Sequence, residues 1–225
     1  IKNVFLCGQH ETIDNRISNL FKGTDTKIYT KTSDEFLEKI ISDNKINPFI
    51  ICVYWPYLLK KNILDKTTST INFHPALLPI NRGWYPHVHS IIDDSVLGVT
   101  LHKISERADE GDVWSQKQIF IPDNYTALDA YLLLQKEIFK LFTEKWSLIR
   151  DNKIEAFPQD NSKSNYHKKS EIDNLDYIDI NDDYNKYIIN KLRARSFGNK
   201  GFAYFIDSNG NKIFLNLRLS KTNKF

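Results

Sequence analysis

The feature that most restricts the fold is an alternation, over the first half of the chain, of short apolar runs with amphipathic segments. The run NVFLCG at residues 3–8 ends at a glycine, and PFIICVYW at residues 48–55 is apolar along its whole length. Residues 10–22, between them, repeat apolar residues at helical spacing. Because an unbroken apolar strand is typical of a parallel sheet covered on both faces, the pattern predicts an α/β fold with a Rossmann-like, doubly wound, mostly parallel sheet.

A long helix closes this first part of the chain. Thr126 and Asp129 have the spacing of an N-terminal capping box, and apolar residues then recur at helical spacing. We therefore place a first domain at residues 1–150. Residues 151–180 are rich in Asn, Asp, Lys and Ser and are predicted to be an exposed linker. Residues 181–225 are predicted to form a small C-terminal unit of one helix and a β-hairpin.

The hairpin is indicated by Asn209-Gly210, which lies between the β-rich runs FAYFI and KIFLNLRL. Both faces of these runs are apolar, and an isolated hairpin is barely stable in water. The hairpin therefore needs a partner surface, either the first domain or a second copy of the chain. We expect a homodimer.

Charge and cysteine content exclude some classes of function. The net charge of +3 is too small to indicate a nucleic-acid partner. No apolar stretch reaches the roughly 18 residues that a membrane span needs, and no leader is apparent, so no membrane partner is expected. Cys7 and Cys52 lie within apolar runs, which predicts buried thiols and fits a reducing cytoplasm.

The stretch NFHPALLPINRGW at residues 72–84 is the strongest candidate for a site. In an open α/β sheet, ligands bind beyond the carboxyl ends of the strands. Asn72 and His74 are two residues apart in an extended run, so their side chains point to the same side. Asp109, in the loop ERADEGD between two later strands, is the third polar element. We expect these three side chains to face one cavity.

Together the three groups suit chemistry at a carbonyl. An imidazole can accept a proton near neutral pH, a carboxylate can fix its tautomer and stabilise the imidazolium, and an amide NH2 can donate to a developing oxyanion. No serine or cysteine stands beside the histidine as an obvious nucleophile, which favours direct attack by a substrate group such as an amine. The residues alone leave group transfer and hydrolysis open.

Three linked motifs carry a resemblance to a known family. They are Asn72-Phe-His74-Pro75-x-Leu-Leu-Pro79 followed by Arg82-Gly83, then Gly98-Val-Thr100-x-His102, then Asp109-x-Gly111-Asp112. In order and spacing, residues 1–125 resemble the 10-formyltetrahydrofolate-dependent formyltransferases. This family includes the glycinamide ribonucleotide, methionyl-tRNA and sugar N-formyltransferases.

The resemblance implies a role for each member of the trio. His74 would take the proton from the attacking amine, Asn72 and protonated His74 would stabilise the oxyanion, and Asp109 would hold His74. The formyl donor would be 10-formyltetrahydrofolate, entering by the loop at residues 54–59 and the loop at residues 105–112. The candidate folate-binding residues are Tyr54, Trp55, Tyr57, Leu58, Ala108 and Asp112.

The chain looks most like the sugar N-formyltransferases, which act on dTDP-linked 4-amino-4,6-dideoxyhexoses and often end in a dimer-forming hairpin. This resemblance implies a nucleotide-linked amino sugar as acceptor, dTDP-4-amino-4,6-dideoxyglucose being our choice, and a product for surface polysaccharides such as O-antigen or lipopolysaccharide. The tRNA-modifying relatives carry a larger basic C-terminal domain, whereas EIDNLDYIDINDD here is acidic and would repel a phosphate backbone. The candidate acceptor-binding residues are His10, Arg82, Gly83, Trp84, Tyr85 and Arg195.

Several of these residues have a structural alternative. Arg82 suits a diphosphate or a loop-fixing ion pair, and Trp84 with Tyr85 suits a ring platform or simple packing. His102 either supports Asp109 or is structural.

The remaining basic and histidine residues stay open too. The basic residues before the hairpin, among them Arg195, are either a diphosphate site or a solvated face. His87 and His89 are two apart on a helix and do not face each other, so no metal site is expected. His167 is predicted to be solvated in the linker.

Two other functions stay open beside formyl transfer to an amino sugar. One is hydrolysis of formyltetrahydrofolate, with water replacing the amine. The other is a non-catalytic module that binds a nucleotide sugar, against which the intact trio argues.

Overall fold

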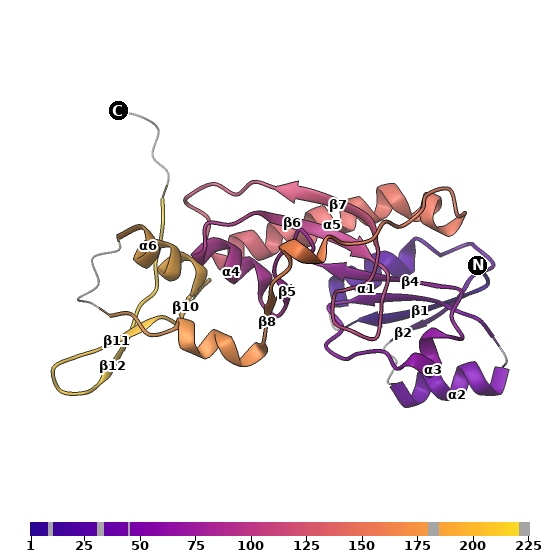
Figure 1. Ribbon diagram of the computed structural model, residues 1–225, viewed down its shortest axis with the longest axis horizontal. Coiled ribbons are helices and arrows are strands. Elements are labelled where there is room, and N and C mark those ends of the chain that lie inside the picture. Colours follow the sequence, from indigo (N-terminus) through magenta and orange to yellow (C-terminus); the bar gives the residue numbers. More distant parts are fainter. Residues whose placement is uncertain (9–10, 31–33, 45, 180–184, 221–225) are drawn as a thin grey trace.

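The computed structural model describes the chain except at residues 9–10, 31–33, 45, 180–184 and 221–225. Its centre is a six-stranded sheet in the order β2-β1-β3-β4-β6-β7 (Figure 1). The first four of these strands are parallel, and β6 and β7 are antiparallel to their neighbours. The prediction of a mostly parallel α/β sheet is therefore confirmed. The six strands are β1 (Asn3–Gly8), β2 (Lys27–Thr30), β3 (Phe49–Val53), β4 (Ser69–His74), β6 (Leu97–His102) and β7 (Val113–Ile119).

Helices cover both faces of the sheet, as the apolar runs require. Alternate side chains of β1 point to opposite faces: Val4 and Leu6 pack with α1 and α5, and Phe5 and Cys7 pack with α2 and α3. Burial on both sides explains why these strands are apolar along their whole length. The helices around the sheet are α1 (Glu11–Asn19), α2 (Asp34–Asn44), α3 (Lys61–Leu64), α4 (Pro86–Ile92) and α5 (Ala127–Arg150).

Helix α5 begins at the expected capping box. The backbone N–H of Thr126 donates to Asp129 Oδ2 at 2.9 Å, which satisfies one of the backbone donors at the start of the helix. Leu134 and Phe142 lie on its fully buried face. Tyr131, which the helical spacing also assigned to the inner face, lines a cavity instead.

The segment that follows α5 is mostly exposed over residues 151–179, as its composition predicts, but it also pairs with the first domain. Phe157 forms an antiparallel bridge with Val113 of β7. The two-residue strand β8 (Tyr166–His167) pairs in parallel with β5 (Arg82–Gly83). Polar side chains of the segment also form hydrogen bonds with residues of the first domain. The segment also contains two short 3-10 helices, η1 (Asn161–Lys163) and η2 (Lys169–Leu175).

The C-terminal part contains the expected helix and hairpin. Helix α6 (Asn185–Ala194) packs against α4. Strands β11 (Tyr204–Ile206) and β12 (Lys212–Phe214) pair antiparallel across a turn in which Gly210 has a φ of 83°. A second short pair consists of β9 (Ser196–Phe197) and β10 (Lys200–Gly201).

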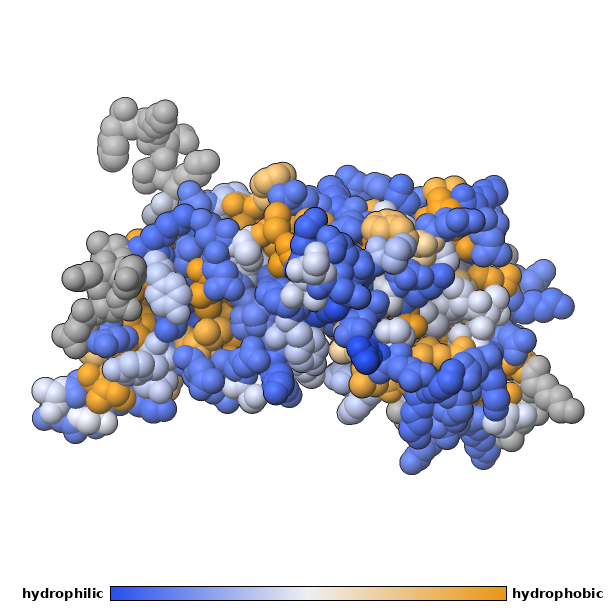
Figure 2. All heavy atoms as spheres, viewed as in Figure 1, coloured by the Kyte–Doolittle hydropathy of each residue, from blue (hydrophilic) through white to orange (hydrophobic). Residues whose placement is uncertain are grey.

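The hairpin leaves apolar side chains at the surface. Ile206, Ile213 and Phe214 are 40%, 39% and 62% exposed. Figure 2 shows this apolar surface at the end of the molecule that carries the hairpin. Among the helices that the structure describes, none combines the length and the apolar character needed to cross a bilayer.

Candidate active site

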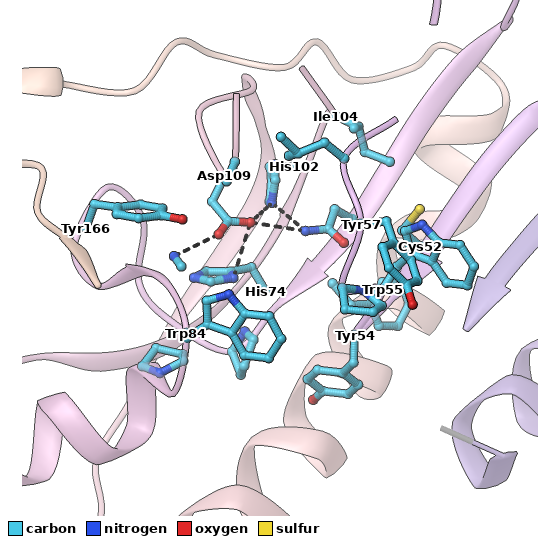
Figure 3. Close-up of a pocket in the computed structure, with 18 of the residues that line it drawn as sticks. Cys52, Tyr54, Trp55, Tyr57, His74, Trp84, His102, Ile104, Asp109 and Tyr166 are labelled. Atoms are coloured by element: carbon cyan, nitrogen blue, oxygen red, sulfur yellow. Dashed lines mark hydrogen bonds and ion pairs between the residues drawn. The ribbon is translucent and has the colours of Figure 1, made fainter. Parts of the chain in front are cut away.

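A cavity of about 740 Å³ opens beside the carboxyl ends of β3 and β4. The sheet register places Cys52, Asn72 and His102 side by side on three neighbouring strands. They lie on the face of the sheet against which α2 and α3 pack at β1 and β3. On this face, the side chain on β3 is apolar and the side chains beside it on β4 and β6 are polar. The cavity lies at this change, and His74, His102 and Asp109 point toward one another at its wall (Figure 3).

Two oxygen atoms of different kinds face the ring nitrogens of His74. Its Nε2 lies 3.1 Å from the backbone oxygen of Asn81, and its Nδ1 lies 3.4 Å from Asp109 Oδ1. Because a carbonyl oxygen only accepts, Nε2 carries the ring hydrogen in the neutral imidazole. The basic nitrogen is then Nδ1, which stands beside a carboxylate that can stabilise the imidazolium.

Asp109 is oriented by donors from two other elements. Its Oδ2 accepts the backbone N–H of Gly83 at 2.9 Å, and its Oδ1 accepts from Asn72 Nδ2 at 3.3 Å. The backbone of Asp109 itself has a φ of 56°, a conformation that Asp tolerates better than most residues. The carboxylate is therefore directed at His74 by the local chain geometry as well as by hydrogen bonds.

Asn72 links this carboxylate to His102. Its Nδ2 also donates to His102 Nε2 at 3.0 Å, while His102 Nδ1 lies 2.6 Å from the backbone oxygen of Lys103. The carbonyl requires a hydrogen on Nδ1, which leaves Nε2 as the acceptor for the amide. Both amide hydrogens of Asn72 are thus directed, one to Asp109 and one to His102.

The pKa values of His74 and Asp109 are both lowered, but for different reasons. Burial lowers the pKa of His74, and the neighbouring Asp109 opposes that shift only in part. Burial alone would raise the pKa of Asp109, but His74, His102 and the Gly83 N–H outweigh it and hold that pKa well below its usual value. A neutral imidazole beside an ionised carboxylate is therefore the resting state near neutral pH.

The segment 151–180 braces both members of the pair. Gln159 Nε2 donates to the backbone oxygens of Asp109 and Gly111 at 2.8 and 2.7 Å. Gln159 Oε1 accepts from Arg82 Nη2 at 2.7 Å. The loop that carries Asp109 is thus tied to β5 through one glutamine.

The same segment also braces His74, through Asn81. The backbone N–H of Asn81 donates to Asn165 Oδ1, and Asn165 Nδ2 donates back to Asn81 Oδ1 at 3.0 Å. Asn81 Nδ2 donates to Ser90 Oγ of α4 at 2.8 Å. With its backbone and its side chain both held, Asn81 presents its carbonyl oxygen to His74 in a fixed place.

Comparison with known proteins decides the family. Residues 8–144 match the family model described as Formyl transferase. The chain belongs to the formyl transferase family. Residues 171–221 match a second model, the N-formyltransferase dimerization C-terminal domain. The resemblance found in the motifs is therefore confirmed.

Three relatives illustrate the likeness. A dTDP-4-amino-4,6-dideoxyglucose formyltransferase of Mycobacterium tuberculosis is 31% identical over 150 residues, 66% of this chain and 64% of that protein. The matching stretch therefore spans slightly less than two thirds of that relative's length. A 4-N formyltransferase from Francisella tularensis has a TM-score of 0.84 at 27% identity, over 98% of this chain and 99% of that one. A formyltransferase from Anoxybacillus kamchatkensis, solved with UDP-4,6-dideoxy-4-formamido-L-AltNAc and tetrahydrofolate, has a TM-score of 0.65 at 28% identity, over 77% and 89%.

Most of the residues expected to bind folate line the cavity. Figure 3 shows Trp55 and Tyr57 on one side of His74. Asp112 does not line it: its carboxylate is 3.8 Å from Lys103 Nζ, on the outer side of the loop. The expected residues that line the cavity are Tyr54, Trp55, Tyr57, Leu58 and Ala108.

The residues expected to bind the acceptor separate into two groups. Gly83, Trp84 and Tyr85 line the cavity, whereas Arg82 and Arg195 do not. The Arg82 guanidinium is buried against Gln159 and Asn161, so the loop-fixing alternative describes it better than a diphosphate site.

Arg195 is also buried, against Asp176, and lies over the ring of Phe202. The pairing with the Asp176 carboxylate and the Phe202 ring explains its burial without any ligand. His10 lies outside the described residues.

Four further lining residues escaped the sequence analysis as ligand contacts: His87, Tyr131, Tyr166 and Lys169. Tyr166 and Lys169 belong to the segment 151–180, which was predicted to be a linker from its polar composition. The aromatic and basic residues of NYHKK within a polar stretch were the available signal.

One histidine cluster resembles a set of metal ligands. His89, His167 and Glu171 have ligand atoms within 4.8 Å of one another. The two rings stack in parallel with centroids 3.5 Å apart, and His167 Nδ1 lies 3.2 Å from Glu171 Oε2. In stacked rings the in-plane nitrogen lone pairs run side by side and do not converge on one point. The expectation that His167 is merely solvated is wrong, and the expectation of no metal site stays a prediction.

Proposed function

We propose that the chain transfers the formyl group of 10-formyltetrahydrofolate to the amine of a nucleotide-linked amino sugar. One observation carries the proposal: at the cavity wall, His74 has one ring nitrogen tied to a backbone carbonyl and the other left basic beside an ionised carboxylate. This arrangement suits proton removal from an attacking amine. Family membership and the activities of the relatives support the same reaction.

In the first step, the acceptor nitrogen forms a bond to the formyl carbon and the carbonyl electrons move to oxygen. His74 Nδ1 takes the proton that the amine loses. Asp109 Oδ1, 3.4 Å away, then faces a positive charge instead of a lone pair, which stabilises the imidazolium. Asn81 keeps Nε2 occupied throughout, so the ring does not present the wrong nitrogen.

The oxyanion needs a donor, which Asn72 supplies, and the positive charge of the nearby imidazolium stabilises it further. Asn72 Nδ2 donates to His102 at 3.0 Å and to Asp109 at 3.3 Å. Its bond to the oxyanion replaces the longer of these two, while His102 holds the amide in place. A single donor of this kind contributes about 100- to 1,000-fold to turnover.

In the second step, the oxyanion electrons re-form the carbonyl and the bond from the formyl carbon to N10 of the folate breaks. The proton on His74 passes to N10. The products are tetrahydrofolate and the N-formyl sugar, and His74 returns to its starting state. Tyr54, Trp55 and Tyr57, with the loop at residues 105–112, bind the folate in this proposal.

For the acceptor, we propose dTDP-4-amino-4,6-dideoxyglucose. The support is the activity named for the Mycobacterium tuberculosis relative and the 4-N formyltransferase from Francisella tularensis. We also propose a homodimer formed through the C-terminal hairpin. Its support is the match of residues 171–221 to a dimerization domain and the exposed Ile213 and Phe214.

The test is a direct assay. The protein is incubated with 10-formyltetrahydrofolate and dTDP-4-amino-4,6-dideoxyglucose, and mass spectrometry should find the sugar nucleotide with one added formyl group. A panel of other dTDP- and UDP-linked amino sugars tests the acceptor assignment. A reaction without acceptor measures formate, whose release at a comparable rate would support hydrolysis instead. Absence of a formylated product from every amino sugar would overturn the proposal.

A further inference from the structure

The cavity has two chemically different ends, with His74 and Asp109 between them (Figure 3). Trp55 and Tyr57, in edge-to-face contact at 5.3 Å, form the end that we assign to folate. In Figure 3, Tyr166 lies on the other side of His74 from Trp55 and Tyr57, and Trp84 lies next to His74. Because the two substrates must meet at His74, the second end is the place left for the acceptor.

A lysine at this second end has no carboxylate partner among the residues that the structure describes. Lys169, at the start of η2, lines the cavity, and its Nζ is 4.8 Å from the centre of the Trp84 ring. Within the described part of the chain, Lys169 takes part in no ion pair, whereas the other lining cation, Arg107, is 3.6 Å from Glu110. Asp109 is the one carboxylate among the lining residues, and it is already bound by the Gly83 N–H.

We propose that Lys169, Tyr166 and Trp84 form the binding site for the nucleoside diphosphate of the acceptor. An ammonium group is a good ligand for a diphosphate, and the two rings offer stacking surface for a base or a sugar. The segment 151–180 thus supplies the diphosphate cation. The inference rests on the proposed function, because it names the residues that select the acceptor of that reaction.

The experiment compares two adjacent lysines. Lys169→Met should raise the KM for dTDP-4-amino-4,6-dideoxyglucose roughly tenfold, with the KM for 10-formyltetrahydrofolate and kcat close to wild type. Lys168→Met is the matched control, since Lys168 is also exposed but does not line the cavity. Lys169→Arg keeps the charge and should restore most of the loss.

Titration calorimetry with dTDP alone makes the test independent of turnover. Lys169→Met should weaken the binding of dTDP by a similar factor, and Lys168→Met should not. Equal effects of the two lysine variants, or a change only in the KM for the formyl donor, would overturn the inference while leaving formyl transfer intact. If no amino sugar is formylated but dTDP binding still depends on Lys169, the proposed function fails and the diphosphate site stands.

Discussion

The catalytic cleft and the C-terminal hairpin differ in how they are completed. In the cleft, His74 is buried, the Asp109 side chain is 12% exposed, and groups of the same chain orient both. In the hairpin, Ile213 and Phe214 stay exposed, and residues 171–221 match a dimerization domain. The difference fits a site whose proposed groups all come from one chain, and it fits the homodimer that we propose through the C-terminal part.

The largest effect is expected when the general base is removed while the hydrogen bond to Asn81 is kept. In His74→Gln, the side-chain amide can still donate to the Asn81 carbonyl, but no basic nitrogen faces Asp109. We expect kcat to fall by about 100- to 10,000-fold, because that is the usual contribution of a general base. Steady-state kinetics measures the loss, and sedimentation should find the oligomeric state unchanged. Turnover near that of wild type would exclude His74 as the base.

The charge of Asp109 can be tested through the pH dependence of kcat. Burial lowers the pKa of His74, so the acid limb of the wild-type profile should lie below pH 6.5. An anion nearby favours the imidazolium, and Asp109→Asn removes it while keeping an acceptor for the Gly83 N–H. The pKa of His74 should therefore fall further and the limb should move to lower pH. We also expect kcat to fall by roughly 100- to 10,000-fold. A limb that moves upward would contradict the assigned charge state.

Much of the fold and the centre of the site could be predicted from local patterns. Asn72 and His74 share a face because strand side chains alternate, and this holds wherever β4 lies in the sheet. The capping box at Thr126 and the turn at Asn209-Gly210 are set by neighbouring residues, and both are present in the structure. Such signals are readable because cause and effect lie within a few residues.

The bracing of the site could not be predicted because its partners are remote in sequence. Asn165 and Asn81 are 84 positions apart, and Gln159 acts on backbone oxygens 48 and 50 positions away. A polar segment that bonds to another part of the chain has the same composition as one that bonds to water. Arg82 was ambiguous for the same reason, because its side-chain hydrogen bonds go to neutral side chains in that segment.

A smaller effect should follow from loosening the bracing while leaving the catalytic groups in place. Gln159→Leu removes the donors to the Asp109 and Gly111 oxygens and the acceptor for Arg82 at nearly constant volume. We expect kcat to fall roughly tenfold, since a misplaced carboxylate stabilises the imidazolium less well. The acid limb should shift downward, in the same direction as in Asp109→Asn, which a general loss of folded protein would not produce. Gln118→Leu changes an exposed glutamine of β7. It is the control and should leave kcat and the acid limb unchanged.

The smallest effect on turnover should come from the hairpin, where the comparison predicts a change of assembly instead. Phe214 is 62% exposed and packs only on its cross-strand neighbour Tyr204, at 5.7 Å between ring centres, among the ring contacts that the structure describes. Phe214→Glu places a charge where a second copy would bury the ring, so sedimentation velocity should show a monomer at concentrations where the wild type is a dimer. Because no residue of the hairpin lines the cavity, kcat should change less than about threefold. Phe120→Glu alters a phenylalanine that is 82% exposed outside the C-terminal part, and it should leave the dimer intact. A wild type that is monomeric at micromolar concentration, or a dimer that survives Phe214→Glu, would remove the hairpin from the interface.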